Sequence, residues 1–296
     1  MSDKELKRAV IALGYFDSVH RGHKKVIEKA KELASSLNAI TVVFTFEGNL
    51  KAVLGNNQEK VVFTPLERQK FIKDLGADEI FFAPANKDFL SMEKGDFLRL
   101  LNKTYNVLSY VSGQDYRFGK FGEGTVDDIE HYALNHGQTA HVVNTLCVNG
   151  KRVSTTAIKG LLSAGDVENA NLLLGRKYSI TGKVVEGRKV GGKIGFPTVN
   201  VSIDKDKHRL KDGVYQGEVD IDGKTYVAVI NYGARPTFNL DEKLIEAHVI
   251  DFNGVIYGKT LTLRFSRFMR EIIKFNNCDE LKEQLIKDVK RVKGDI

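Results

Sequence analysis

The residues best suited to chemistry begin in segment 14–23, which reads GYFDSVHRGH. His20 and His23 stand three positions apart, so they share one face if a helix begins here. The free N–H groups of a helix N-terminus attract phosphate, and Gly22 lets that phosphate approach the backbone closely. Two imidazoles so placed can donate hydrogen bonds to charge that develops on an α-phosphate. The alternative is an ordinary strand-to-helix turn with two solvated histidines.

A metal site is the weaker interpretation of the histidines. His20, His23, His131, His136 and His141 have neither a neighbouring thiolate nor the HExxH pattern that binds zinc on a helix. The sequence therefore favours phosphate over zinc as the partner of the first two.

A second patch, segment 151–159, reads KRVSTTAIK and combines hydroxyl groups with cations. Arg152 and Lys159 at the start of a helix can clamp a triphosphate, since guanidinium and ammonium groups bind phosphate oxygens. Thr155 and Thr156 can add hydroxyl donors. Ser and Thr are also good N-caps, so a structural role explains these hydroxyl groups equally well.

Segment 182–195 is basic and rich in glycine, and its four cations outnumber the single Glu186. Glycines let a backbone approach phosphate closely, and cations suit its charge. No GKS or GKT follows, so the segment is not a Walker P-loop. Thr198 and Asn200 come next, and their side-chain oxygens suit Mg²⁺. A flexible, solvated hairpin is the competing interpretation.

Glu246 lies in segment 245–252, IEAHVIDF, which alternates as a strand does. The alternation puts Glu246, His248 and Ile250 on one face. A carboxylate there can accept a proton from a hydroxyl group that attacks ATP. An exposed strand glutamate without a catalytic role is the alternative.

Strands and helices alternate in the first half of the chain, as β-branched runs and helical spacing indicate. The expected strands are 10–13, 40–46, 79–82, 107–111 and 140–148. The expected helices are 23–37, 65–75, 91–101 and 126–135. Thr64, Pro65 and Glu67 mark the start of the second helix as N-cap, first residue and capping-box partner. This order predicts a doubly wound parallel sheet, which binds ligands beyond the carboxyl ends of its strands.

The second half changes character near residues 174–178, where strands begin to follow one another directly. The expected strands are 178–185, 213–221, 224–231, 245–252 and 261–268. Asp222 and Gly223 join two of them as a hairpin. A small antiparallel barrel is expected, closed by helix 278–292. The apolar face of that helix is predicted to hold Leu281, Leu285, Ile286, Val289 and Val292.

The predicted organisation is therefore an α/β domain over residues 1–173 and a barrel domain over 174–296. The length of 296 residues fits two domains of about 100–200 residues each. No run approaches the roughly 18 apolar residues of a membrane span, and the charged start MSDKELKRAV lacks the apolar region of a signal peptide. Cys147 and Cys278 are the only cysteines, which is typical of a reducing compartment. We expect a cytoplasmic protein; the sequence makes no prediction of its oligomeric state.

Most of the positive charge lies in the second half. Residues 1–172 hold 22 Lys or Arg and 21 Asp or Glu, whereas residues 173–296 hold 23 and 17. Such a surplus suits nucleic acid, a membrane surface or a phosphorylated small molecule. No RNA-recognition motif is visible, and four cations gather in the glycine-rich segment, which favours the small molecule.

Together and in this order, the motifs resemble the bacterial bifunctional riboflavin kinase/FMN adenylyltransferase (FAD synthetase) family. The similarity to its adenylyltransferase runs through segments 14–23, 111–124 and 151–167. The similarity to its kinase runs through segments 192–200, 213–215, 230–238, 245–252, 257–259 and 268–275. The resemblance covers nearly the whole chain, and the ordered co-occurrence of these motifs is far more specific than any one of them.

The resemblance implies that His20 and His23 stabilise an adenylyl transition state and that Glu246 activates the ribityl 5′-hydroxyl. It implies that Thr198 and Asn200 bind Mg²⁺ and ATP phosphate. The nucleotide-binding residues it implies are Gly14, Phe16, Asp17, Gly22, Asp115, Arg152, Thr155, Thr156, Lys159, Gly182, Lys193, Gly195, Thr198 and Asn200.

The implied chemistry has two steps. Riboflavin and ATP give FMN and ADP in the second domain, where Arg270 is expected on the flavin side. FMN and ATP then give FAD and pyrophosphate in the first. Both steps use Mg²⁺, and the implied partners are riboflavin, FMN and ATP, without nucleic acid or membrane.

Departures from the family pattern lie mainly in the first domain. Tyr15 stands where members usually have Asn or Thr, Ser18 where they have Gly, and residues 48–50 where a Pro-His-Pro segment is usual. Lys159 and Lys193 replace Arg. These changes motivate an alternative, a member with only one of the two activities. A non-catalytic flavin- or RNA-binding regulator is a more remote one.

Overall fold

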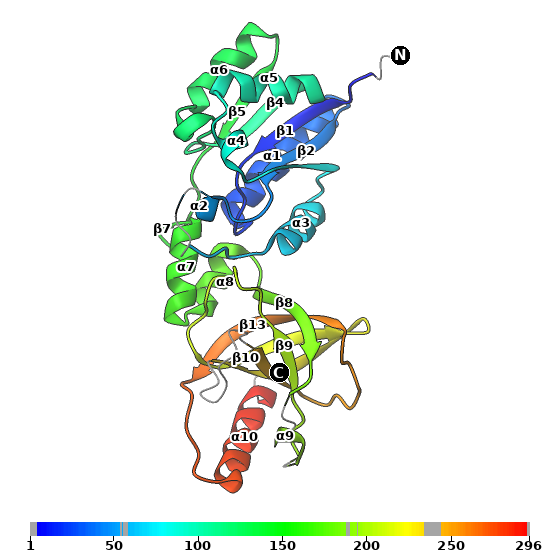
Figure 1. Cartoon of the computed structure of the whole chain (residues 1–296), viewed down its shortest axis with the longest axis vertical. Helices are drawn as coiled ribbons and strands as arrows, with labels where there is room; N and C mark the ends of the chain where they lie inside the picture. The colour runs from blue at the N-terminus through cyan, green and yellow to red at the C-terminus, as the bar shows by residue number, and fades with distance from the viewer. Residues whose placement is uncertain are drawn as a thin grey trace. The chain divides into compact units, whose positions relative to one another are not determined.

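The structure, a computed structural model, describes residues 5–53, 55, 59–187, 190–193, 195–233 and 244–294. It divides into two compact units, Met1–Thr155 and Thr156–Ile296. Each unit has its own sheet, labelled in Figure 1.

The first unit is built on a five-stranded parallel sheet of order β3-β2-β1-β4-β5. Its strands are β1 (Arg8–Leu13), β2 (Ile40–Phe46), β3 (Glu79–Ala83), β4 (Asn106–Gly113) and β5 (Thr139–Val143). In β1, Ile11 and Leu13 join one core cluster, while Val10 and Ala12 join another. Both faces of the sheet are therefore buried, which confirms the doubly wound architecture.

Helices supply the cover on both faces. Ile27 and Ala30 of α1 pack into one core, and Phe97 and Leu101 of α5 pack into the other. The helices of this unit are α1 (Arg21–Ser36), α2 (Leu50–Val53), α3 (Pro65–Asp74), α4 (Lys87–Leu90), α5 (Lys94–Thr104), the 3₁₀ helix η1 (Lys120–Gly122) and α6 (Val126–Asn135).

The start of α3 confirms the predicted capping box. Thr64 Oγ1 accepts a hydrogen bond from Glu67 N at 3.4 Å, and Glu67 Oε2 accepts one from Thr64 N at 2.9 Å. Pro65 takes the first helical position, where its missing N–H costs nothing.

Two expected elements of this unit are wrong in extent. The helix predicted over 91–101 is α5, which begins at Lys94 and ends at Thr104, three residues later at each end. Ser91 instead closes the short helix α4, with its N–H bonded to Lys87 O. The strand predicted over 140–148 is two elements. β5 ends at Val143, and β6 (Cys147–Val148) pairs instead with β7 (Lys151–Arg152) in a hairpin.

The second unit contains a closed barrel of order β10-β11-β12-β9-β8-β13, with antiparallel neighbours throughout. Its strands are β8 (Tyr178–Val185), β9 (Val199–Ser202), β10 (Gly213–Ile221), β11 (Lys224–Tyr232), β12 (Leu244–Val249) and β13 (Thr260–Arg270). The expected hairpin is confirmed, since Asp222 and Gly223 adopt φ angles of 50° and 81° between paired Ile221 and Lys224. The four-residue strand β9 was not predicted.

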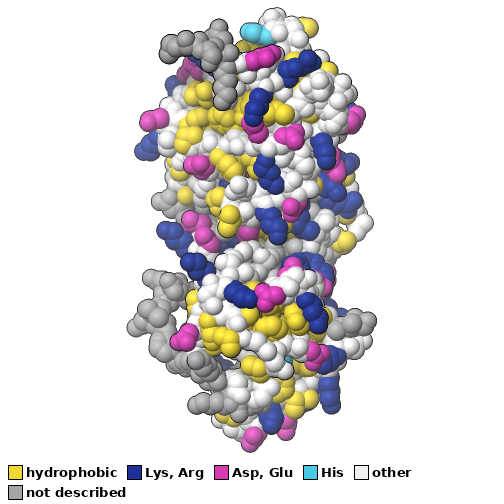
Figure 2. Space-filling view, turned by 90° about the vertical axis from the view of Figure 1, so that its right-hand side faces the viewer, with side chains coloured by type: hydrophobic (Ala, Val, Ile, Leu, Met, Phe, Trp, Pro, Cys, Tyr) yellow, Lys and Arg dark blue, Asp and Glu magenta, His cyan; other side chains and the backbone are white. Residues whose placement is uncertain are grey.

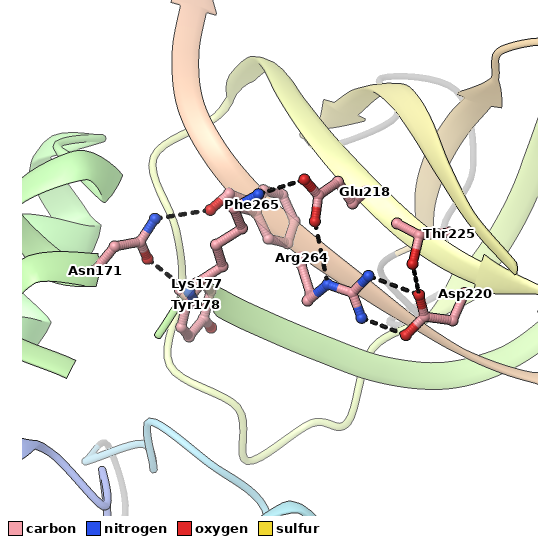
Figure 3. Close-up of polar contacts among 8 residues, drawn as sticks. All are labelled: Asn171, Lys177, Tyr178, Glu218, Asp220, Thr225, Arg264 and Phe265. Carbon is pink, nitrogen blue, oxygen red and sulfur yellow. Dashed lines mark hydrogen bonds and ion pairs between the residues drawn. The ribbon is translucent and has the colours of Figure 1, made fainter. Parts of the chain in front are cut away.

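Four helices accompany the barrel: α7 (Thr155–Ala164), α8 (Val167–Leu174), α9 (Val190–Lys193) and α10 (Cys278–Lys293). Asn171 ties α8 to the barrel, donating to Phe265 O at 2.9 Å and accepting from Tyr178 N at 2.6 Å (Figure 3). Beside it in Figure 3, Arg264 binds the carboxylates of Glu218 and Asp220 across neighbouring strands. These contacts fix β8, β10 and β13 against one another and against α8.

The closing helix α10 packs on the barrel with most of the predicted face. Val292 is buried against Val214, Val229 and Met269, as expected. Ile286, however, is 38% exposed, whereas polar Asp288 is 3% exposed. Asp288 joins this inward face through its ion pair with Arg270 of β13, and the prediction is wrong at Ile286.

Candidate active sites

The loop that follows β1 is held in a strained shape. Phe16 and Val19 have φ angles of 51° and 40°, which side chains other than glycine rarely adopt. Both side chains are buried in the core. A Cβ at Gly14 would lie 2.8 Å from the Phe16 ring, so only glycine fits there. Such strain persists only where the surroundings impose it, and it is common at functional sites.

The two histidines stand at the N-terminus of α1. His20 is the N-cap, and its Nδ1 accepts a hydrogen bond from His23 N at 3.1 Å. The two rings stack with centroids 3.6 Å apart, and the Phe16 ring meets His23 edge-on at 5.1 Å. Because Nδ1 of His20 accepts, its Nε2 can carry the proton that a phosphate oxygen would receive as a hydrogen bond.

The structure brings segment 14–23 into contact with Thr155 of segment 151–159. Ser18 is buried, and its Oγ lies 2.9 Å from Oγ1 of Thr155, the first residue of α7. Arg152 forms an ion pair with Asp115, the residue predicted to lie near this site. Three segments therefore meet: the loop after β1, the loop after β4 and the residues before α7. They meet beyond the carboxyl ends of the strands, where a parallel sheet binds ligands.

Other predicted residues of the first site have different surroundings. Phe16 is a core residue, and Asp17 Oδ1 accepts a hydrogen bond from Val62 N at 2.8 Å. Gly22 lies beside the His20 ring. Thr156 and Lys159 belong to the second unit, where the buried Lys159 accepts a hydrogen bond from His208 Nε2 at its carbonyl.

In the barrel, strand register gathers the polar residues of the second motif. Asn200 of β9 pairs directly with Glu246 of β12, which pairs on its other side with Asn231 of β11. Residues directly opposite on antiparallel strands have Cβ atoms about 5 Å apart and point to the same face. Glu246 therefore stands between two amide side chains. Asn231 was not singled out from the sequence, because only the pairing shows its place.

Two glycines of the glycine-rich segment 182–195 pack closely against other residues of this region. A Cβ at Gly187 would lie 2.0 Å from Asn200 Nδ2, and one at Gly191 would lie 2.2 Å from Phe196 O. Phe196 N in turn donates to Gly191 O at 2.8 Å. The glycines here permit close packing against Asn200 and the chain before it, a function that the sequence did not reveal.

A cavity of about 350 Å³ lies beside the start of β9. Thr198 lines it together with Pro197, Val199, Val184 and residues 249 and 252–257. His248 shares the half-buried face of β12 with Glu246, and its Nδ1 lies 2.8 Å from Pro197 O. Ile250, expected on this face, lies beyond the end of β12 and is buried in the core.

The remaining predicted residues of the second site are placed as follows. Gly182 lies inside β8, where a Cβ would lie 1.9 Å from Ser202 O, and Gly195 adopts a φ of 87°. The side chain of Lys193 and residues 234–238 of segment 230–238 lie outside the described residues. Arg270 forms an ion pair with Asp288 of α10. Its Nη2 donates to Asp288 Oδ2 at 2.7 Å, and its Nε donates to the same carboxylate.

Two family models match the chain, each over one of these sites. A model described as FAD synthetase matches residues 2–157, and one described as riboflavin kinase matches residues 174–295. The first range contains both histidines and Thr155, and the second contains Asn200 and Glu246. Residues 158–173 fall between the two matches, and the expected domain boundary at 173/174 stays a prediction.

Relatives match over nearly their full length. A Bacillus subtilis (strain 168) protein is 37% identical over 294 residues, with 96% of this chain and 92% of the relative covered. An Escherichia coli (strain K12) protein is 29% identical over 291 residues, with 97% and 93% covered. Both carry the name bifunctional riboflavin kinase/FMN adenylyltransferase.

A solved structure agrees with the whole fold. It is a crystal structure described as that of a macrolide-efflux protein from Streptococcus pneumoniae, 29% identical, with a TM-score of 0.88 over 97% of this chain and 94% of the other. The transport activity in that description belongs to that protein alone. Among the residues described here, no helix is long and apolar enough to cross a membrane.

A parallel sheet with helix N-termini gathered beyond its strands, followed by a barrel with a polar cross-strand row, defines a two-module nucleotide-dependent transferase. With the two models and the relatives at 29–37% identity, the particular family follows. The chain belongs to the bifunctional riboflavin kinase/FMN adenylyltransferase family.

Proposed function

We propose that this chain makes FMN and then FAD. Its barrel unit transfers the γ-phosphoryl group of ATP to riboflavin, and its α/β unit transfers the adenylyl group of a second ATP to FMN. The observation that carries the proposal is that each family model falls on one of the two sites that the geometry assembles.

In the kinase step, the Glu246 carboxylate accepts the proton of the ribityl 5′-hydroxyl as that oxygen attacks the γ-phosphorus. The bond from the γ-phosphorus to the bridging oxygen breaks, and ADP leaves. Asn200 and Asn231 flank the base on the neighbouring strands and hold its orientation. The cavity lined by Thr198 receives the nucleotide.

The residues present fit Mg²⁺ that arrives with the nucleotide. Thr198 and Asn200 offer neutral oxygens, and the described residues contain no group of three or more His, Cys, Asp or Glu placed to hold a metal. Mg²⁺ often has few protein ligands and keeps phosphate and water oxygens. When bound, it neutralises charge on the transferring phosphate. Thr198 and Asn200 are its proposed protein ligands.

In the adenylyl step, a phosphate oxygen of FMN attacks the α-phosphorus of ATP, and pyrophosphate leaves. His20 and His23 donate hydrogen bonds to the charge that develops there, beside the N–H groups at the start of α1. Arg152 and Thr155 are proposed to bind the phosphates. Arg270 is proposed to act on the flavin side of the other reaction, through the contact it makes with α10.

The basic surplus is better explained by phosphates than by nucleic acid. On the face drawn in Figure 2, Lys and Arg side chains lie interspersed with Asp and Glu rather than gathered in one field. RNA binding needs a continuous basic surface and falls steeply with salt. We propose small-molecule partners and, because Cys147 and Cys278 are both exposed free thiols, a cytoplasmic location.

The test is chromatographic separation of riboflavin, FMN and FAD after incubation of the purified chain with Mg-ATP. Riboflavin is expected to give FMN with ADP, and supplied FMN to give FAD with pyrophosphate. One product without the other establishes the single-activity alternative. Neither product, together with salt-sensitive RNA binding, establishes the regulator.

A further inference from the structure

One arginine in the first unit is completely buried. Arg68 lies on α3 with 0% of its surface exposed. Among the described residues, no carboxylate lies within ion-pair distance of it. A cation out of water without an anionic partner is costly, so the groups around it must compensate. Burial also lowers the pKa of Arg68, an effect that Tyr15 and Asp17 oppose.

The partners of Arg68 come from two strand ends. Its Nη1 donates to Tyr15 O, which follows β1, at 3.0 Å. Its Nη2 donates to Phe46 O and Gly48 O, at the end of β2, at 2.9 and 3.3 Å. Three backbone carbonyls on two segments thus accept hydrogen bonds from a single guanidinium.

Tyr15 completes the arrangement. Its ring lies 5.1 Å from the guanidinium carbon of Arg68, close enough for a cation–π contact. Its hydroxyl accepts from Leu50 N at 3.2 Å and donates to Gly48 O at 3.4 Å. Burial raises the pKa of Tyr15 to about 12, so the phenol stays neutral and its hydroxyl can donate.

The segment that Arg68 and Tyr15 hold leads directly to the phosphate-binding residues. Tyr15 is followed by Phe16 and, four residues later, by the N-cap His20. Strain at Phe16 and Val19 has to be imposed by contacts on either side of the loop. Arg68 supplies such contacts through its hydrogen bonds to Tyr15 O, Phe46 O and Gly48 O. Because Arg68 is buried, its charge also adds a positive potential that water screens only weakly.

We propose that Arg68 is a positioning residue for adenylyl transfer, holding the segments after β1 and β2 so that the loop before α1 binds the ATP phosphates. The inference rests on the proposed function. Loss of Arg68 removes one donor from each of three partly buried carbonyls and loosens both segments. Tyr15 O keeps the Thr45 hydroxyl as a donor, and Gly48 O keeps the Tyr15 hydroxyl. Its effect is confined to the first activity, since every contact lies in the first unit.

The test compares Arg68→Met and Arg68→Lys with Arg99→Met. Arg99 is an exposed arginine on α5 of the same unit that pairs with Asp96. The KM for ATP in FMN adenylylation is expected to rise about tenfold in the Met variant and about threefold in the Lys variant. Riboflavin phosphorylation and the control variant are expected to stay within about twofold of wild type.

This readout separates positioning from a structural role. A smaller folded fraction lowers the apparent kcat and leaves the KM for ATP unchanged. An unchanged KM in folded Arg68→Met overturns the proposal. If that variant does not fold, Tyr15→Phe serves instead, because it removes only the hydroxyl bonds to Leu50 and Gly48. An unchanged KM there overturns the proposal too.

Hydrogen exchange gives a measurement that does not depend on turnover. The Leu50 amide is expected to exchange about tenfold faster in Arg68→Met than in wild type, with no change in Arg99→Met. Unchanged exchange refutes the inference about Arg68. Absence of FAD formation by the wild-type chain refutes the proposed function instead, so the two failures are distinguishable.

Discussion

The two candidate active sites are assembled in opposite ways. In the barrel, Asn200, Glu246 and Asn231 occupy one row of three paired strands, so backbone hydrogen bonds set their spacing. In the α/β unit, His20 and Thr155 stand on helix starts and loops separated by more than a hundred residues. Their approach depends on side-chain contacts such as the one between Ser18 and Thr155. Register builds one site, and tertiary contacts build the other.

Two arginines, the fully buried Arg68 and the 18%-exposed Arg270, repeat this contrast. Arg270 extends the register of the barrel row, opposite Val214 on β10, and is neutralised by Asp288 of α10. Arg68 has carbonyls and an aromatic ring as partners. The first arginine fastens a helix to an already ordered sheet. The second joins two loops that are otherwise held by separate side-chain contacts, such as that of Asp17 with Val62 N, so its loss should affect ligand binding more than stability.

The largest expected effect is at Glu246, the proposed base, which register places between two amide side chains. Glu246→Gln is expected to lower FMN formation by about 10²–10⁴-fold, because the amide cannot accept the hydroxyl proton. FAD formation from supplied FMN is expected to be unchanged. The two rates are measured on one preparation, with Glu283→Gln, an exposed position of α10, as the control. Loss of both activities in a folded variant would contradict the division into two sites.

The second-largest effect is expected for the ion pair between Arg270 of β13 and Asp288 of α10. Asp288→Ala leaves Arg270 without its partner in a site where Asp288 is 3% exposed, and removal of one member of a buried pair costs about 3–5 kcal/mol. The urea concentration at which riboflavin phosphorylation is lost is expected to fall, while the loss of FAD formation keeps its midpoint. Adding Arg270→Met is expected to restore much of the stability. If the double variant is no more stable than the single one, the pair is not what fixes α10.

His23 tests the loop-built site in the same chain. His23→Ala removes a donor from the α-phosphate, and loss of one such donor costs about 10²–10³-fold in rate. FAD formation is expected to fall by that factor, with FMN formation unchanged. His131→Ala is the matched control, since His131 is exposed on α6 and contacts only its own helix. An equal loss in the control would show that the effect is not local to the phosphate loop.

Features that depend on local sequence could be predicted, whereas those that depend on contacts between distant residues could not. The strands β8 and β10 have the predicted bounds, because alternation is a local signal. The capping box at Thr64 is local as well and is confirmed. β9 was missed because four residues after a proline carry too little pattern. Arg68 was missed because its partners lie 20 to 53 positions away in sequence, and nothing in its neighbours shows that it is buried.

The smallest expected effect concerns two capping boxes of the same kind, at the starts of α3 and α6. Thr64 caps α3 and Thr125 caps α6 with the same reciprocal geometry, 3.4 Å to the third helical N–H in both. Replacing either by Ala is expected to cost about 1 kcal/mol of unfolding free energy. Only α3 carries Arg68, so only Thr64→Ala should also raise the KM for ATP in FAD formation, by about twofold. Thr125→Ala should lower stability and leave that KM unchanged. Equal KM values in the two variants, at equal losses of stability, would mean that α3 contributes to folding alone and that the loops after β1 and β2 are ordered without it.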